Sequence, residues 1–148
     1  MLTIELARRL IESGVEWTPS TGDRFVLSVP GMEDDVFVIS ELTVDVHHFA
    51  SGDVLGFNGT TEWALDSIEQ SKVIWLPRED QLRELAGDDF VGLERIEGGY
   101  AVVLRTRSGE LERCIDIDAE RAYARAVLLR QDDRPGERRG EETDGGAA

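Results

Sequence analysis

The feature that most constrains this chain is a run of four apolar residues, Val73-Ile74-Trp75-Leu76, that ends at Pro77. The run is short and partly β-branched, which indicates a strand buried on both faces or a buried crossover. Pro77 has no N–H to continue a sheet ladder, so the strand ends there. Proline also suits the entry to a helix, and the next residues predict a helix that ends at Gly87, a residue that favours the αL C-cap.

The segment before this strand predicts a turn and then a helix. Asn58 and Gly59 both tolerate positive φ, as a turn requires. Thr60 or Thr61 can then cap a helix by accepting hydrogen bonds from its free N–H groups. Early carboxylates suit the positive end of the helix dipole, and apolar residues recur at helical spacing; these positions are Glu62, Asp66, Ala64, Leu65 and Ile68.

Two β-rich blocks flank this central stretch, at residues 23–57 and 90–118. In the first, residues 36–39 are wholly apolar and predict a central strand covered on both sides. Residues 43–49 alternate and predict a strand that turns back at Ser51-Gly52-Asp53. In the second block, three strands joined by tight turns predict an antiparallel meander.

Amphipathic helices are expected at both ends of the folded region. Residues 3–13 carry an apolar stripe of Ile4, Ala7, Leu10 and Ile11 and end at Gly14. Asp118 is a natural N-cap for a last helix over residues 119–130. The fold class predicted is α+β, a largely antiparallel sheet with helices packed on it. Both halves run helix, strands, helix, which indicates either a duplicated α-β-β-β-α unit or a chance similarity.

The chain length of 148 residues fits one domain, which we assign to residues 1–131. Residues 132–148 have no apolar side chain except the terminal alanines, so they predict a disordered acidic tail. The net charge of −15 repels phosphate backbones and anionic membranes. We therefore expect no binding to nucleic acid or to membranes. A basic protein partner would fit this charge, although a general role in solubility explains it as well.

The few residues that could carry chemistry give no strong site. Cys114 is the single cysteine, which excludes an intrachain disulfide and a cysteine-cluster zinc site, and it is better explained as a small core residue. His47 and His48 are adjacent in a strand and point to opposite faces, so they cannot chelate one metal. Asp116 and Asp118 could act in acid–base chemistry, but a helix cap explains Asp118. We expect no metal, no cofactor and no catalytic residue.

A phosphate-binding loop is also absent from the sequence. Lys72 is the only lysine and has no glycine-rich segment before it, which excludes a P-loop ATPase. The N-terminal residues have no basic segment before an apolar core, so they are not a signal peptide. The longest apolar run is far too short to span a membrane. A cytoplasmic location follows by default.

One tryptophan stands out as a candidate for recognition. Trp17, Trp63 and Trp75 fall in three different elements and could line a pocket if they converge. Trp75 is expected in the core, whereas Trp63 lies off the apolar stripe of its predicted helix. An exposed tryptophan among polar groups is typical of an interface. The candidate binding surface is therefore Asn58, Thr60, Thr61, Glu62, Trp63 and Asp66; the alternative is a helix cap with a tryptophan at its rim.

Three stretches carry a resemblance to a known family: GFNGTTEWALDSIEQ at residues 56–70, WLPREDQLREL at residues 75–85 and ELARRL near the N-terminus. Together they resemble small actinobacterial proteins described as pilus assembly protein CpaE-like, over most of residues 1–130. Larger CpaE proteins contain a ParA/MinD-type ATPase domain, whose Walker lysine is missing here. The resemblance implies a bacterial, cytosolic source and carries over no catalytic residue.

Three functions remain open on this evidence. The first is a non-enzymatic protein-interaction module that uses the surface around Trp63. The second is an enzyme or a binder of a small ligand, with a pocket between the two β-rich blocks. The third is an acidic partner of the immunity or antitoxin type that neutralises a basic protein.

Overall fold

The structure is a computed structural model of the chain, and it describes residues 1–40, 43–49, 52–58, 67–69 and 72–134. Within these residues lie helices and antiparallel three-stranded sheets, so the predicted α+β class is confirmed. The chain divides into two compact units, each described by itself. Unit 1 consists of residues 1–16 and the chain from residue 79 onward, and unit 2 consists of residues 17–78.

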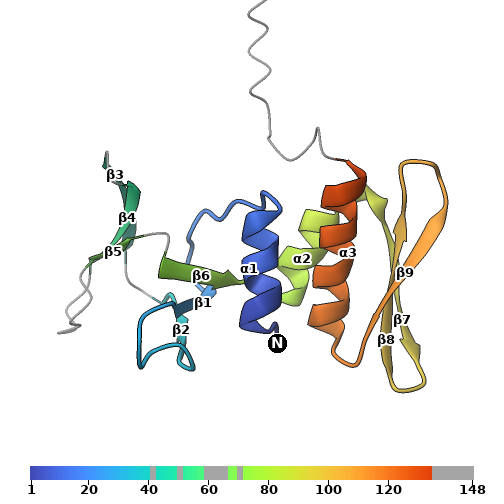
Figure 1. The fold of residues 1–148 in the computed structure, drawn as a ribbon, viewed down its shortest axis with the longest axis horizontal. Coiled ribbons are helices and arrows are strands. Elements are labelled where there is room, and N and C mark those ends of the chain that lie inside the picture. Colours follow the sequence, from blue (N-terminus) through green and yellow to red (C-terminus); the bar gives the residue numbers. More distant parts are fainter. Residues whose placement is uncertain (41–42, 50–51, 59–66, 70–71, 135–148) are drawn as a thin grey trace, which may run out of the picture. The chain divides into compact units, whose positions relative to one another are not determined.

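Figure 1 labels the elements along the chain. Each sheet contains three strands, in the orders β2-β1-β6, β3-β4-β5 and β7-β8-β9. The elements of the described residues are α1 (Ile4–Glu12), β1 (Arg24–Leu27), β2 (Val36–Val38), β3 (Thr43–Phe49), β4 (Gly52–Asn58), β5 (Ser67–Glu69), β6 (Val73–Leu76), α2 (Glu79–Ala86), a 3₁₀ turn (Gly87–Asp89), β7 (Phe90–Ile96), β8 (Gly99–Arg105), β9 (Leu111–Asp116) and α3 (Ala119–Asp133).

Helix α1 of unit 1 begins and ends as predicted. The Thr3 side chain accepts a hydrogen bond from the Leu6 N–H at 3.2 Å, and the chain leaves the helix at Gly14, whose φ is 100°. The predicted apolar stripe was wrong at Ile11, whose side chain is 45% exposed. Ala7 and Leu10 of the predicted stripe are buried, together with Leu6, because a stripe centred on these positions turns residue 11 away from the neighbouring helix.

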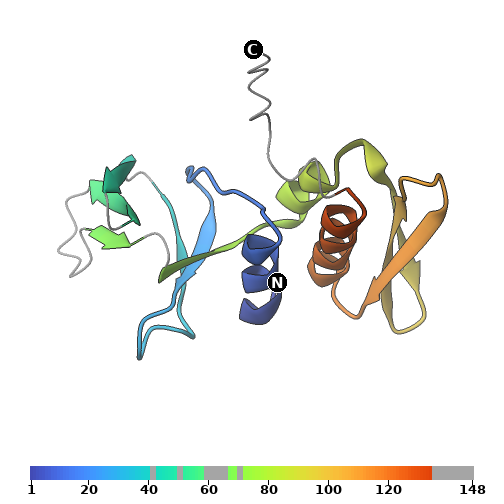
Figure 2. The same ribbon diagram turned by 45° about the horizontal axis from the view of Figure 1, so that its top comes forward.

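The predicted meander is confirmed as the sheet β7-β8-β9 of unit 1. Helix α3 packs on β8 and β9 and also contacts α1 and α2, so that it lies between the sheet and α1 (Figures 1 and 2). Asp118 caps α3 as predicted, since its carboxylate accepts from the Arg121 N–H at 3.0 Å. The helix runs through Asp133, so Asp132 and Asp133, which the sequence placed in the tail, belong to α3.

In unit 2 the strand predicted at Val73–Leu76 is confirmed as β6, and all four of its residues are buried. The predicted central position of residues 36–39 was wrong. Strand β2 lies at a sheet edge, and Val36 and Val38 are 39% and 57% exposed. Strand β1 occupies the centre because both β2 and β6 pair with it. An apolar run indicates burial, but it does not specify which strand has two neighbours.

The predicted hairpin of residues 43–57 is confirmed as β3 and β4, with Val46 opposite Leu55. The helix predicted after Asn58 was wrong at its end, because Ser67–Glu69 form strand β5, with Ile68 opposite Leu55. Residues 59–66 of that helix lie outside the described residues. Pairing with the preceding strand β4 here overrides the local helical spacing.

The sequence left open whether an α-β-β-β-α unit is duplicated, and the described residues favour a chance similarity. The second half shows this order, with β7, β8 and β9 between α2 and α3. The described residues of the first half instead form six strands, in two sheets, between α1 and α2. The similarity of residues 60–68 to the start of α3 therefore does not reflect two copies of one unit.

Replacement of Trp75 by alanine tests the core of unit 2. Trp75 is 8% exposed and its ring stacks on Trp17 with centroids 6.0 Å apart. We expect Trp75→Ala to lower the free energy of unfolding by about 3–5 kcal/mol, as for other buried aromatic residues. Urea denaturation followed by circular dichroism measures this change, with the exposed edge residue Val38→Ala as the control. A loss below about 1 kcal/mol would contradict the assignment of Trp75 to the core.

Candidate functional site

The candidate site begins with the orientation of strand β9 relative to helix α3. Alternate residues of a strand point to opposite faces of the sheet. The Asp116 carboxylate lies 3.5 Å from the Arg121 guanidinium and 3.0 Å from that of Arg125, both on α3. Residues 112, 114 and 116 therefore face α3, and residues 111, 113 and 115 face away from it.

The face of β9 that points away from α3 is the aliphatic one. Leu111 and Ile115 are 54% and 58% exposed, and Ile117, the residue just after the strand, is 72% exposed. We call these three residues the β9 stripe. A half-buried strand normally turns its apolar side inward, and here the polar side points to the helix instead. Arg113 lies on the same face between Leu111 and Ile115. Exposed aliphatic residues gathered on one face often mark a surface that another molecule covers.

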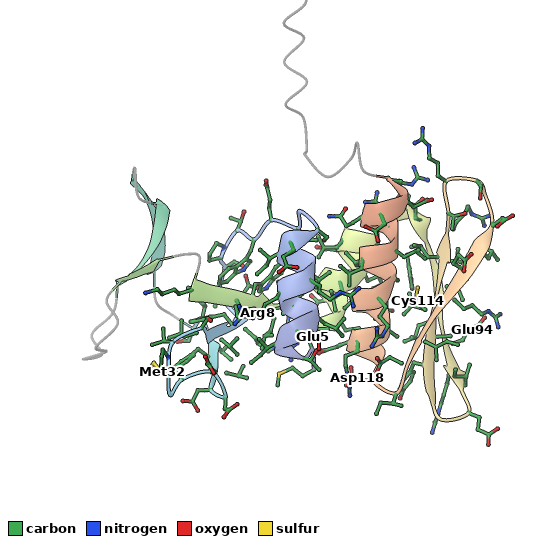
Figure 3. All side chains as sticks on the ribbon, in the orientation of Figure 1. Glu5, Arg8, Met32, Glu94, Cys114 and Asp118 are labelled. Carbon is green, nitrogen blue, oxygen red and sulfur yellow. The ribbon has the colours of Figure 1, made fainter. Side chains whose placement is uncertain are left out.

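An ion pair crosses the sheet beside the β9 stripe. Arg113 of β9 and Glu94 of β7 approach to 3.2 Å, although they lie on the two outer strands. Their register partners on the middle strand are Val103 and Ala101, so the pair spans β8 and covers these small side chains, which are 4% and 1% exposed. Figure 3 shows Glu94 and Cys114 on this sheet.

The sheet is close to neutral in an acidic chain. Residues 90–117 contain five carboxylates and four arginines, a net charge of −1, whereas the whole chain carries −15. Charge repulsion is therefore weak at the β9 stripe. This composition suits contact with a neutral, apolar surface better than contact with a strongly charged one.

The two edges of the same sheet differ in regularity. The register of β7 against β8 shifts between Phe90 and Gly92, which marks a β-bulge. Strand β9 instead pairs with β8 in an unbroken register from Leu111 to Asp116, and no other described strand pairs with it. Bulges protect sheet edges against further pairing, whereas a regular edge with aliphatic side chains is open to it.

The carboxylates on the helix side of β9 are held as anions. Burial alone would raise the pKa of Asp116, but a hydrogen bond from the Asp118 N–H and the guanidinium groups of Arg125 and Arg121 lower it below 3.8. The pKa of Asp118 is likewise lowered, because the Met1 amine at 2.9 Å and the Arg121 N–H outweigh its burial. Neither carboxylate has the raised pKa that a general acid requires near neutral pH.

The thiol of Cys114 lies on the helix side of β9 and is half-buried. Burial, together with the Glu112 carboxylate, raises its pKa, and the opposite effect of Arg125 is smaller. A nucleophilic cysteine needs a lowered pKa. This environment agrees with the interpretation of Cys114 as a packing residue.

Two of the three tryptophans converge in unit 2. Trp17 stacks on Trp75 and donates a hydrogen bond from Nε1 to the buried Asp23 carboxylate at 2.8 Å. Asp23 also pairs with Arg78 at 3.2 Å. These contacts satisfy the buried carboxylate and fix the loop before β1, which is a structural role. Trp63 lies outside the described residues.

Of the candidate surface predicted from the sequence, only Asn58 lies within the residues that the structure describes. Asn58 is the last residue of β4 and lies opposite Thr43. Thr60, Thr61, Glu62, Trp63 and Asp66 lie outside the described residues, so that surface stays a prediction. His47 and His48 lie on β3 opposite Val54 and Asp53. In the described part of the chain, no three His, Cys, Asp or Glu residues are grouped as a metal site would require.

The sequence interpretation missed the β9 stripe. The alternation of aliphatic and polar residues over 111–117 was visible, but the general rule would have buried the aliphatic side. The spacing of the arginines in α3 is the signal that could have corrected this assignment. Arg121 and Arg125 are one helical turn apart, and both contact Asp116.

Comparison with family models, with curated proteins and with solved structures gave no match. None of the described helices is long and apolar enough to cross a membrane.

Substitution of Asp116 tests the contact that orients β9. A carboxylate whose pKa is lowered in the folded state stabilises the fold above its ordinary pKa of 3.8 and loses this effect as the pH falls below it. We expect Asp116→Asn to reduce stability by about 1–3 kcal/mol near neutral pH, and we expect the difference from the wild type to shrink below about pH 4. Urea denaturation at several pH values measures it. Glu97→Gln, in the exposed β7–β8 turn, is the control. A difference that is independent of pH would contradict this role.

The raised pKa of Cys114 predicts a slow thiol. At pH 7 the folded protein should react with iodoacetamide more slowly than the urea-unfolded chain does, because burial disfavours the thiolate. Mass spectrometry of the singly alkylated chain gives both rates. A folded-state rate above the unfolded rate would show an activated cysteine and would revive the enzyme hypothesis.

Proposed function

We propose that this chain is a non-enzymatic protein-interaction module and that the β9 stripe is part of its binding surface. The observation that carries the proposal is the outward aliphatic side of β9, with Leu111, Ile115 and Ile117 each more than half exposed. Burial of these side chains against another protein would remove apolar surface from water, at about 25 cal/mol per Å². The compartment we propose is the bacterial cytosol, as the resemblance of the sequence implies.

The chemistry of the stripe favours a protein over other ligands. The acidic chain disfavours the phosphate backbone of nucleic acids. The candidate acid–base residues Asp116 and Asp118 are engaged by cations, which weighs against an enzyme that uses them. A stripe on a regular sheet edge fits best a folded partner that presents a strand with aliphatic side chains.

The second candidate is an acidic partner that neutralises a basic protein. The net charge of −15 favours it, because opposite charge accelerates association. The near-neutral surface at the β9 stripe is the argument for the first candidate over the second, since a basic partner would bind a more acidic face.

Crosslinking in the source cells tests the first candidate. A tagged wild-type chain is compared with Ile115→Asp and with the matched control Val91→Asp, because Val91 is also exposed, at 48%, but lies on the other edge strand of the sheet. We expect the wild type and Val91→Asp to crosslink the same protein, whether another chain or a further copy of this one. We expect Ile115→Asp to lose at least about 90% of this product, as a charge in an apolar contact is costly.

Circular dichroism of the purified variants is the folding control for this experiment. Equal crosslinking of all three chains would contradict a role for the β9 stripe. The surface predicted from the sequence is tested in the same assay with Trp63→Ala and Glu62→Arg. Loss of the product in these variants, with the fold retained, would locate recognition at residues 58–66 instead.

A further inference from the structure

We infer that the occupant of the β9 edge is a second copy of this chain, whose own β9 pairs with it in antiparallel orientation about a two-fold axis at Cys114. The two sheets β7-β8-β9 would then form one six-stranded sheet. The inference rests on the proposed function and specifies the partner of the same surface. Symmetric dimers are the commonest assemblies of soluble proteins, and a strand edge is self-complementary when both faces match.

The aliphatic face matches itself in this arrangement. With Cys114 on the axis, Leu111 lies opposite Ile117 of the second copy, and Arg113 lies opposite its Ile115. The two β9 stripes thus lie side by side across the new strand pair, with the stem of each Arg113 beside Ile115 of the other copy. Leu111, Ile115 and Ile117 are each more than half exposed in one chain, and neighbours across strands would cover them on pairing.

The helix-facing side brings Glu112 of one copy next to the arginine-bound Asp116 of the other. Glu112 is exposed, and in this register it lies opposite Asp116 of the second copy. The Asp116 carboxylate is contacted by the guanidinium groups of Arg121 and Arg125, while Asp118 and Glu120 nearby contact the Met1 amine, so the group is neutral. Two carboxylates opposite each other repel, and the Arg125 side chain, which is 44% exposed, offsets this repulsion by contacting the incoming Glu112. The two-fold axis produces this contact twice.

The alternatives for this edge are weaker. The bulge at Phe90–Gly92 disfavours the same pairing at β7. A strongly basic partner would gain little from a region whose net charge is −1. The general repulsion between two chains of −15 opposes dimerisation, so added salt should strengthen the dimer by screening it.

Sedimentation velocity of the purified full-length chain is the first test. We expect a concentration-dependent dimer that is strengthened by salt and weakened at least about tenfold by Ile115→Asp, which corresponds to the loss of one well-buried apolar contact. Val91→Asp makes the same chemical change on β7 and should leave the dimer unchanged. A wild-type chain that stays monomeric up to about 1 mM would overturn the inference.

Charge reversal tests the register. Glu112→Arg removes the contact with the arginine cluster and should weaken the dimer, whereas Glu97→Arg changes the net charge equally in the exposed β7–β8 turn and should not. Equal effects of the two substitutions would show that only the overall charge matters and would overturn the proposed register.

The single cysteine tests directly the position of the two-fold axis. Cross-strand residues lie about 4.5–5.5 Å apart between Cα atoms, within the range that a disulfide can bridge. Copper(II)-phenanthroline should therefore link Cys114 to Cys114 of the second copy, as two copper(II) ions accept one electron each and the two thiol protons pass to water. The control is Ser108→Cys in a Cys114→Ser chain, since residue 108 lies in the turn before β9 and two such residues would be more than about 20 Å apart in this arrangement.

The outcomes separate the two proposals. A dimer linked through residue 108 and not through Cys114 would overturn the antiparallel β9 pairing. A monomeric purified chain whose crosslinking in cells still depends on Ile115 would overturn self-pairing and leave the proposed function intact, with a different protein on the stripe. A monomer that crosslinks nothing through Ile115 would refute both.

Discussion

The contact between Asp116 and the arginines of α3 determines how unit 1 presents its sheet. The carboxylate is 9% exposed and lies between Arg121 and Arg125. The even-numbered residues of the strand face the helix, and the two guanidinium groups offset the cost of burying the carboxylate there. A second contact of the same kind fixes the other end of α3, where Arg130 and Arg134 both reach Asp89 at about 3 Å. Helix α3 is therefore held at both ends by ion pairs with the segments that flank the sheet.

This anchoring has a consequence on the opposite face. Because side chains alternate along a strand, the face that keeps Asp116 under α3 must expose Leu111 and Ile115. The middle strand contributes small buried residues there, and the Arg113–Glu94 ion pair covers them. What remains uncovered is an aliphatic stripe on a regular edge. The proposed function and the proposed dimer both follow from this one orientation.

Sequence reasoning was reliable where a local pattern and a cap agree. The helices at residues 3–13 and 119–130, the meander after Phe90 and the buried strand Val73–Leu76 were each predicted and are each present. Their signals are short-range, since a capping side chain, a turn glycine or a proline acts within a few residues. The same reasoning failed at β5, where Ile68 fits a helical stripe but pairs with Leu55 of another strand. It also failed at β2, where an apolar run lies at an edge.

The sequence by itself determined the class of the fold, the ends of most elements, the acidic charge and the single cysteine, because each depends on composition or on neighbours along the chain. The candidate surface at Asn58–Asp66 was likewise a local inference, and it remains one. Only the tertiary structure decided which strand is central, that residues 67–69 form a strand paired with β4, and which side of β9 faces solvent. The last is seen in the contact between Asp116 and a helix that follows it, because the alternation of side chains along a strand gives two faces but does not say which of them a helix will cover.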